Sequence, residues 1–429
     1  MLLPCYSECI VPVLSPASAF SRITALAAQR PVHAAFAWLH AHPKTMMDWQ
    51  SEIVAIPAPL NGEQQRAQWL TERFAEAGVH SVASDAAGNV LGILPAANLP
   101  PESTGPLVVL SAHLDTVFPA GTPLVPVIAN GRLQAPGACD NAAGIVGLLA
   151  VVHALIHAAV ELPAPLAVLG NVGEEGEGDL HGVRHFYEHS PLAGRVAAHI
   201  VLDGAGAEAA VTQALGSRRY RVHVTGPGGH SFTDAGTPNP IAALATALAL
   251  LAETPLPEAP RTTLNLGTVS GGISVNSIPE SAEATVDFRS TDPGELLRLE
   301  VGLDRAVEDA VEQWNTRAKA AGADSRGSLT FAIAKIGDRP AAHLAEDSAL
   351  LAALRAVDRH LGLRSDLRLG STDANLPLSL GVPALSMGAG GEGGLAHTLH
   401  EWYAPKDREL GLKRVLLLTL AMLEWAAGQ

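Results

Sequence analysis

Several apolar, strand-like segments of this 429-residue chain run directly into acidic residues or histidines. The segments and the residues that follow them are LVVLSA (107–112) with His113 and Asp115, LAVLGNV (166–172) with Glu174 and Glu175, and AHIVL (198–202) with Asp203. Ligands of open α/β sheets bind beyond the carboxyl ends of the strands. We therefore expect these side chains to meet at one edge of a mostly parallel sheet, which places the fold in the α/β class.

The order of the predicted elements indicates two domains. Helix-like and strand-like segments alternate before residue 213 and after residue 337, as in parallel-sheet units. Between these parts the order is β-α-β-β-α-β, the split pattern of a ferredoxin-like domain. We expect a catalytic domain built from residues 45–213 and 337–429, with an inserted α+β lid or dimerisation domain at 214–336.

The first 44 residues are expected to be a loose extension ahead of a domain that starts near Ala34. Their apolar start has no basic region and is interrupted by Pro4, Glu8 and Pro12, so it does not resemble a signal peptide. The chain has no run of eighteen apolar residues that could span a membrane. We expect a soluble cytoplasmic protein.

Composition narrows the choice of partners and cofactors. The 28 basic and 43 acidic residues give a formal charge of −15. This charge argues against nucleic acid, whose binding depends on Lys and Arg neutralising phosphates. The chain has three cysteines and no CxxC pair, so any metal must be held by His, Asp and Glu.

The acidic residues at the expected sheet edge require compensating cations. They are Asp115, Asp140, Glu174, Glu175 and Asp203. Gathering them in one cleft would cost several kcal/mol in repulsion and desolvation. Imidazole and carboxylate ligands without thiolate suit a catalytic zinc, with cobalt or manganese as alternatives. Five candidate ligands fit two ions that share a carboxylate, and Asp140, at the start of an apolar helix, is the best candidate for this bridge.

Spacing suggests roles for three further residues. Asp115 stands two residues after His113, close enough to accept the second ring N–H of the imidazole and fix its tautomer. Glu174 precedes a presumed ligand, Glu175, and is free to act as a general base. Cys139 lies next to Asp140; a redox role is conceivable, but a small buried filler is the better interpretation.

Six ordered motifs resemble one known family. They are SAHLDTV (111–117), GACDNAAG (137–144), GNVGEEGEGDLHG (170–182), VLDG (201–204), GPGGHS (226–231) and AHTLHEW (396–402). Together they cover nearly the whole chain from about Thr45 onward. They are similar to the zinc-dependent exopeptidase and deacylase family of glutamate carboxypeptidase, aminoacylase, acetylornithine deacetylase, carnosinase and peptidase T.

The resemblance implies two zinc ions bridged by Asp140. One ion would be completed by His113 and Asp203, and the other by Glu175 and His397. His400 is the competing candidate for the last ligand. His397 is favoured because the ligand of this family stands four residues before a Glu, which is Glu401 in this chain.

The resemblance also implies roles in catalysis and substrate binding. Asp115 would orient His113, and Glu174 would be the general base and later the proton shuttle. His230 would stabilise the tetrahedral oxyanion across a homodimer. Substrate would be bound by Asn276 and Arg289, and by the loops of residues 371–375, which include Ser371 and Thr372, and 388–394. Arg289 has a structural alternative, pairing with Asp287 or Glu283.

These features predict a metal-dependent hydrolase that cleaves an amide or peptide bond of a small substrate, an N-acyl amino acid or a dipeptide. A peptidase T-like aminopeptidase acting on short peptides is the first alternative. A catalytically inactive metal-binding protein and a one-metal aminopeptidase of related fold are weaker ones. Glu174 argues against the former, and the inserted segment with His230 against the latter.

Overall fold

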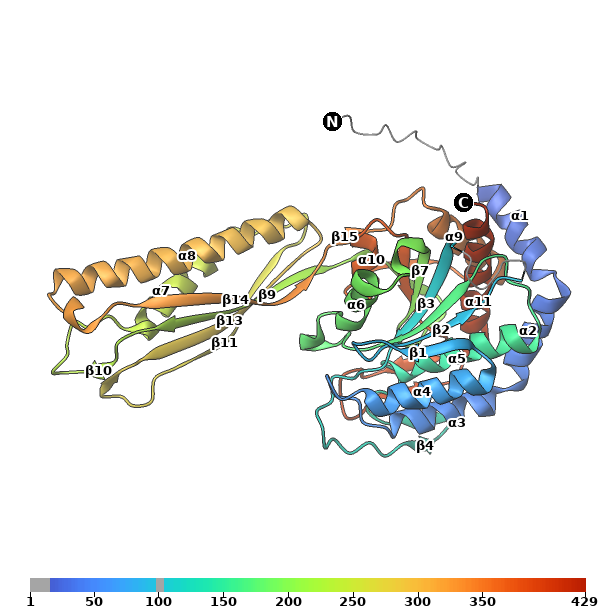
Figure 1. Cartoon of the computed structure of the whole chain (residues 1–429), viewed down its shortest axis with the longest axis horizontal. Coiled ribbons are helices and arrows are strands. Elements are labelled where there is room, and N and C mark those ends of the chain that lie inside the picture. Colours follow the sequence, from blue (N-terminus) through green and yellow to red (C-terminus); the bar gives the residue numbers. More distant parts are fainter. Residues whose placement is uncertain (1–15, 98–103) are drawn as a thin grey trace. The chain divides into compact units, whose positions relative to one another are not determined.

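The computed structural model describes residues 16–97 and 104–429 (Figure 1). The chain divides into two compact units. The first comprises the chain up to Thr212 together with Leu344–Arg368 and Thr372–Gln429, and the second comprises Gln213–His343 and Leu369–Ser371. Among the described helices, none combines the length and apolar character needed to cross a membrane.

A nine-stranded mixed sheet has most of its strands in the first unit and forms the framework of that unit. Its order is β1-β2-β6-β3-β7-β17-β8-β15, and β16 pairs with β8. The strands are β1 (His80–Ser84), β2 (Val90–Leu94), β3 (Leu107–His113), β6 (Leu166–Asn171), β7 (Val196–Leu202), β8 (Ala209–Ala214), β15 (Ala342–His343), β16 (Asp366–Gly370) and β17 (Ala384–Met387). The α/β class expected from the sequence is confirmed. The central strands pair in parallel: β3 with β6 and β7, and β7 with β17.

The central strands are apolar along their whole length because helices cover them. Every residue of β3 and β6 is buried, as in parallel strands that are covered on both faces. Helices α5 (Ala142–His157) and α11 (Arg408–Ala427) pack against β3, and α4 (Gln64–Ala77) packs against β2. Helix α5 is buried nearly all round, which explains its lack of a polar face.

The expectation of a loose N-terminal extension is wrong for residues 16–44. Helices α1 (Pro16–Ala27) and α2 (Arg30–Ala41) and the first residues of α3 (Pro43–Val54) occupy this stretch. They pack on α9 (Ala349–Leu361), α11 and α5. The apolar residues of α2 recur at helical spacing and bury one face of the helix. The stripe is short and carries Pro31, His33 and His40 among its apolar residues, so the sequence pattern alone does not predict this helix. Residues 1–15 lie outside the described residues.

The second unit has the β-α-β-β-α-β order expected from the sequence. Its elements are β9 (Gly216–Thr225), α7 (Pro240–Ala252), β11 (Thr263–Gly271), β13 (Ser281–Ser290), α8 (Pro293–Ala320) and β14 (Thr330–Arg339). The strands form an antiparallel sheet in the order β11-β13-β9-β14. Burial alternates along β13, because one face of the sheet packs on α7 and α8 (Figure 1). The side chains of the opposite face are polar.

Two small sheets complete the framework. Strands β18 (Glu392–Gly394), β19 (Trp402–Ala404), β5 (Arg132–Gln134) and β4 (Val127–Ala129) form one of them. In the second unit, β10 (Gly229–His230) pairs with β12 (Ser277–Ile278). The remaining helices are α6 (His181–His189) and α10 (Asn375–Ser379), with short 3-10 turns at Gly176–Gly178, Ala193–Arg195 and Asp324–Arg326. The pairing of β19 with β5 brings the C-terminal loop that follows β18 beside the loop before α5.

Packing of the N-terminal helices can be tested at Leu39, which is 1% exposed. We expect Leu39→Ala to lower the free energy of unfolding by about 2–5 kcal/mol, because it leaves a cavity in a close-packed interface. The exposed Ala34→Ser in the same helix is the control and should change it by less than about 0.5 kcal/mol. Urea denaturation measures both, and an equal, small effect of the two substitutions would contradict this packing.

Candidate metal centre

The topology brings the strand-end residues to one edge of the sheet. His113 is the last residue of β3, Asp203 follows β7 directly, and Glu174 lies three residues beyond β6. Strand β3 pairs in parallel with both β6 and β7, so the carboxyl ends of all three strands meet there. Asp140 stands two residues before α5, which packs beneath the same strands.

Asp140 lies between two histidines. The Nε2 of His113 is 3.1 Å from its Oδ1, and the Nε2 of His397 is 2.9 Å from its Oδ2. The same His397 nitrogen is 3.0 Å from Oε1 of Glu175, and the His113 nitrogen is 3.9 Å from Oδ1 of Asp203. All five sequence-predicted ligands are thus brought together. Each carboxylate oxygen of Asp140 faces a different imidazole, which is how a bridging carboxylate is disposed.

The cluster has the chemistry of a site for divalent cations. His113, Asp140 and Glu175 each offer a ligand atom, and these atoms lie within 4.8 Å of one another. Oε1 of Glu175 is buried without a hydrogen-bond partner, because the nearby Nε2 of His397 directs its hydrogen bond to Asp140. Imidazole nitrogens and carboxylate oxygens suit zinc. The residues therefore fit the pair of metal ions that the sequence predicts.

The electrostatics of the cluster show that it needs positive charge. Burial opposes the charged form of His113, but hydrogen bonds to the surrounding aspartates outweigh it and raise its pKa well above the ordinary value. The hydrogen bond to Asp140 raises the pKa of His397 to about 9. Burial raises the pKa of Glu175 to about 7. Without metal, the protonated imidazoles and the proton on Glu175 offset the negative charge, and binding of cations must displace these protons.

His397 is the histidine that contacts the cluster. It has φ +64°, a conformation that is uncommon for a residue with a side chain. His400, the competing candidate, is exposed, and its backbone N–H donates to the hydroxyl of Thr398. The geometry therefore favours His397 as the last ligand.

Asp115 differs in detail from the sequence-based interpretation. The Nδ1 of His113 lies 3.2 Å from the backbone oxygen of Asp115, and its carboxylate is farther away at 3.6 Å. The carboxylate accepts the backbone N–H groups of Glu174 at 3.0 Å and of Glu175 at 2.7 Å. Burial raises the pKa of this carboxyl, but His113 and these N–H groups outweigh burial and lower it. Asp115 thus holds both the imidazole and the Glu174–Glu175 segment in place.

Glu174 and Cys139 occupy buried positions next to the ligands. Glu174 is 6% exposed, and its backbone N–H donates to Asp115, so its backbone is held next to that of Glu175. Burial raises the pKa of the Cys139 thiol to about 12. A thiol held in its neutral form is a poor nucleophile, which supports the interpretation of Cys139 as a small filler.

Two residues that sequence reasoning missed support the site. Asn141 caps α5 by accepting the N–H of Gly144, and its side chain also contacts Leu202 and Gly204 on either side of Asp203. Its position as an N-cap after Asp140 was the available signal. The second is the fully buried Asp373, which accepts a hydrogen bond from Asn171 at 2.7 Å and whose pKa burial raises to about 7. The only sequence signal for Asp373 was its position in the STDAN segment (371–375), which resembles a substrate-facing loop of the family.

His230 and Asn276 lie together in the second unit. His230 ends β10 and Asn276 directly precedes β12, the strand that pairs with β10. The N–H of Ser231 donates to the backbone oxygen of Asn276. The Nδ1 of His230 lies 3.2 Å from the N–H of Phe232 and accepts its hydrogen bond. An accepting Nδ1 requires the proton to be on Nε2. His230 is exposed, so it can offer this N–H to a ligand.

The other predicted substrate residues have structural partners. Arg289 donates to Asp287 at 2.7 Å, which is the structural alternative that the sequence left open. Ser371 accepts a hydrogen bond from Arg339. Thr372 is buried, and its backbone N–H donates to the side chain of Asn375. None of these contacts by itself indicates a substrate.

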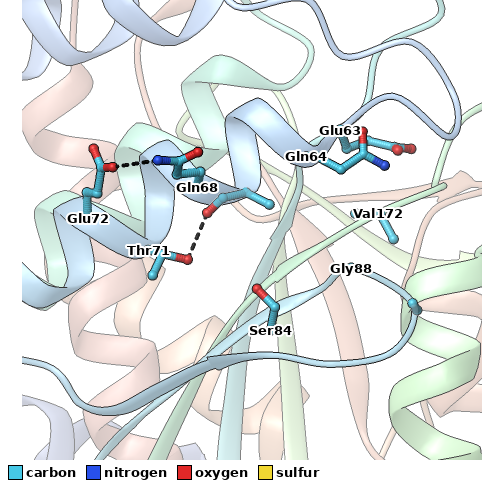
Figure 2. Close-up of a pocket in the computed structure, with 10 residues that line it drawn as sticks. Glu63, Gln64, Gln68, Thr71, Glu72, Ser84, Gly88 and Val172 are labelled. Carbon is cyan, nitrogen blue, oxygen red and sulfur yellow. Dashed lines mark hydrogen bonds between the residues drawn. The ribbon is translucent and has the colours of Figure 1, made fainter.

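A surface pocket of about 440 Å³, lined by none of the five predicted ligands, lies between α4 and the β1–β2 turn (Figure 2). Its polar groups hydrogen-bond within the protein. Gln68 donates to Glu72, Thr71 donates to the backbone of Ala67, and Glu63 accepts the N–H of Asn61. With its polar groups satisfied in this way, the pocket offers no comparable site for chemistry.

Comparison with protein families matches residues 109–421 to peptidase family M20/M25/M40. This stretch is well over half of the chain, so the chain belongs to this family, and the resemblance noted in the sequence is confirmed. A probable carboxypeptidase of Aspergillus flavus is 30% identical over 253 residues, which are 51% of this chain and 56% of that protein. One of Neosartorya fischeri is 28% identical over 260 residues, 55% of this chain and 54% of that protein. The chain spans about half the length of these curated relatives.

Solved structures share the fold. Aminopeptidase PepT from Bacillus cereus has a TM-score of 0.67 at 19% identity, covering 88% of this chain and 98% of that one. Human carnosine dipeptidase 1 has a TM-score of 0.66 at 17% identity, covering 91% and 99%. Bacillus subtilis YXEP, a dinuclear metal-binding peptidase, has a TM-score of 0.58 at 15% identity, covering 89% and 98%.

The raised pKa values predict how the metal-free protein responds to pH. Native Glu175 and Asp373 keep their protons up to about pH 7, whereas the unfolded chain loses them near pH 4. Native His397 keeps its proton up to about pH 9. At these three groups the native state therefore binds more protons across this range, and their contribution to stability should fall as the pH rises from about 4 to about 9. Burial lowers the pKa of His199 to about 3, which acts in the opposite sense below about pH 6.5, so the fall in stability is expected chiefly between pH 7 and pH 9.

Urea denaturation of chelator-treated protein at pH 5, 7 and 9 measures this trend. His397→Ala should flatten the part of the trend between pH 7 and 9 and leave the part below pH 7. A stability that rises from pH 7 to pH 9 in the metal-free protein would contradict the proton-linked account of the cluster.

Proposed function

We propose that this protein is a two-zinc hydrolase that cleaves an amide or peptide bond of a small substrate. The observation that carries the proposal is the position of Asp140, whose two carboxylate oxygens face His113 and His397. Asp203 would complete the ligands of one ion and Glu175 those of the other. When bound, the ions supply Lewis acidity, which acidifies water and polarises the scissile carbonyl.

The residues of the chain provide the proton transfers and the orientation. The Glu174 carboxylate accepts a proton from the attacking water and returns it to the leaving nitrogen. Asp115 is hydrogen-bonded to both His113 and the backbone of Glu174. The separation between the base and the metal ligands therefore stays fixed during the reaction. The Nε2–H of His230 is assigned to the oxyanion, where a preorganised donor contributes several kcal/mol.

The proposed substrates are N-acyl amino acids or dipeptides with a free carboxylate. Arg289 supports this class because its guanidinium can bind a carboxylate in a bidentate manner, although substrate must then compete with Asp287. A peptidase T-like aminopeptidase activity is the second candidate. The fold shared with PepT from Bacillus cereus favours it.

A hydrolysis screen tests the proposed function. N-acyl amino acids, dipeptides and tripeptides are each incubated with the zinc-loaded protein, with and without a chelator. Turnover that requires metal is expected on the first two classes, and turnover confined to tripeptides would favour the aminopeptidase. Activity that resists chelation, or no activity on any class, would overturn the proposal.

Substitution of Glu174 distinguishes an enzyme from a protein that only binds metal. Glu174→Ala should retain both zinc ions, because Glu174 is not among the five ligands, and should lower kcat by about 10²–10⁴-fold. Glu177→Ala, an exposed position in the same loop, is the matched control and should leave kcat unchanged. Turnover numbers are measured together with metal content. Undiminished turnover in Glu174→Ala would rule out its role as the base.

We also propose a homodimer formed through the second unit. Strand β11 lies at the edge of its sheet, with Leu266 39% and Val269 67% exposed. A groove of about 490 Å³ lies between β11 and α7 and is lined by apolar side chains that include Ile241 and Leu248. Pairing of this edge with a second copy would satisfy its open hydrogen-bonding groups and cover the apolar groove.

Val269→Glu tests this arrangement because it places a charge in the groove. We expect the wild-type protein to have the mass of a dimer in sedimentation analysis and the variant to shift toward monomer. Ala332→Glu, exposed on the opposite edge strand β14, should leave the mass unchanged. A wild-type protein that is strictly monomeric at all concentrations would exclude the dimer.

A further inference from the structure

Glu401 is a fully buried carboxylate that contacts the loop of the bridging aspartate. Its Oε1 accepts the backbone N–H groups of Cys139 and Asp140, each at 2.7 Å, and its Oε2 accepts the N–H of Gly137 at 3.0 Å. Three donors from one four-residue segment thus converge on a single side chain. Such charge-assisted hydrogen bonds are about twice as strong as neutral ones.

The same residue anchors the loop that carries His397. Glu401 stands four residues after this histidine, and its backbone N–H donates to the oxygen of Thr398. Its backbone oxygen accepts the N–H of Ala135 at 3.1 Å, just ahead of the Asp140 loop. Glu401 is therefore joined by its side chain and its backbone to the loops that carry Asp140 and His397.

Other buried side chains bind the backbone of the Asp140 loop or support the side chain that binds it. Gln50 of α3 donates to the backbone oxygen of Ala138 at 2.6 Å, and Arg408 donates to Gln50. Arg66 is buried nearby and donates to backbone oxygens of Ile56 and Leu114. Every residue from Gly137 to Asp140 thus has a backbone group bound by a buried side chain. The backbone of this loop is therefore held by hydrogen bonds with side chains at four consecutive residues.

We propose that Glu401 is a positioning residue for both metal ions, which sets the distance between the Asp140 and His397 loops before any ion binds. The inference rests on the proposed pair of zinc ions and does not depend on the substrate. If the loop were mobile, binding of each ion would include the entropic cost of ordering Asp140, and the affinity for the ions would fall. Outer contacts of this kind typically change metal affinity by about 10–100-fold.

The test is a zinc titration of the metal-free protein against a chromophoric chelator, which reports each equivalent separately. Glu401→Gln keeps the size of the side chain but presents an amide N–H to one of the three donors. We expect it to weaken both equivalents by about 10–100-fold, because the bridging carboxylate serves both ions. His397→Ala, by contrast, should weaken chiefly one equivalent.

A matched control separates positioning from loss of stability. Asp358 is also a buried carboxylate, and it accepts two hydrogen bonds from Arg414, away from the cluster. Asp358→Asn should lower the melting temperature of the metal-free protein but leave zinc affinity within about 2-fold. If Glu401→Gln weakens zinc no more than Asp358→Asn does, the positioning role is refuted.

A second variant covers the case in which Glu401→Gln does not fold. Glu401→Asp keeps the charge but is one methylene shorter, so it cannot reach all three N–H groups. An intermediate loss of zinc affinity supports the proposal, and unchanged affinity overturns it. If the wild-type protein binds no zinc, the proposed function itself fails. If the wild-type protein binds zinc and the Glu401 variants bind it equally well, only the positioning role fails.

Discussion

Repulsion among buried carboxylates at the sheet edge is the constraint on which the rest of this structure depends. Asp115, Asp140, Glu175, Asp373 and Glu401 are gathered where little water can screen them. In such surroundings, like charges interact several-fold more strongly than in water. The cluster is tolerable only because each carboxylate is matched by a donor, a proton or a cation. The contacts around the cluster follow from this need to compensate each carboxylate.

The carboxylates fall into two groups according to what neutralises them. Asp115 and Glu401 are surrounded by backbone N–H groups, so their charge is used to fix the chain. Asp140 and Glu175 face imidazoles and, in the case of Glu175, have an oxygen without a hydrogen bond. Their charge is therefore available for cations. The first group holds the second in place, which lowers the reorganisation needed when ions bind.

The sequence contained much of the site because each ligand follows a recognisable strand. His113, Glu175 and Asp203 could be predicted from strand ends alone, since parallel strands bring their carboxyl ends together. The strands predicted at 107–112, 166–172 and 198–202 agree with β3, β6 and β7 within two residues at each end, because each is a largely apolar run of the kind that forms a covered strand. The order β-α-β-β-α-β of the second unit was visible because its helices and strands show apolar periodicity.

What the sequence by itself determined, then, is the fold class, the family and the chemical nature of the ligands, because these depend on local pattern and residue type. It did not reveal that residues 16–44 pack as helices, since the helix stripe is short and its partners α5, α9 and α11 are distant along the chain. Nor did it show that His397 contacts Asp140 and Glu175, or that Glu401 binds the loop of Asp140 across 261 residues. Only the tertiary structure decided these points, because they depend on which backbone N–H groups a side chain can reach once the chain has folded.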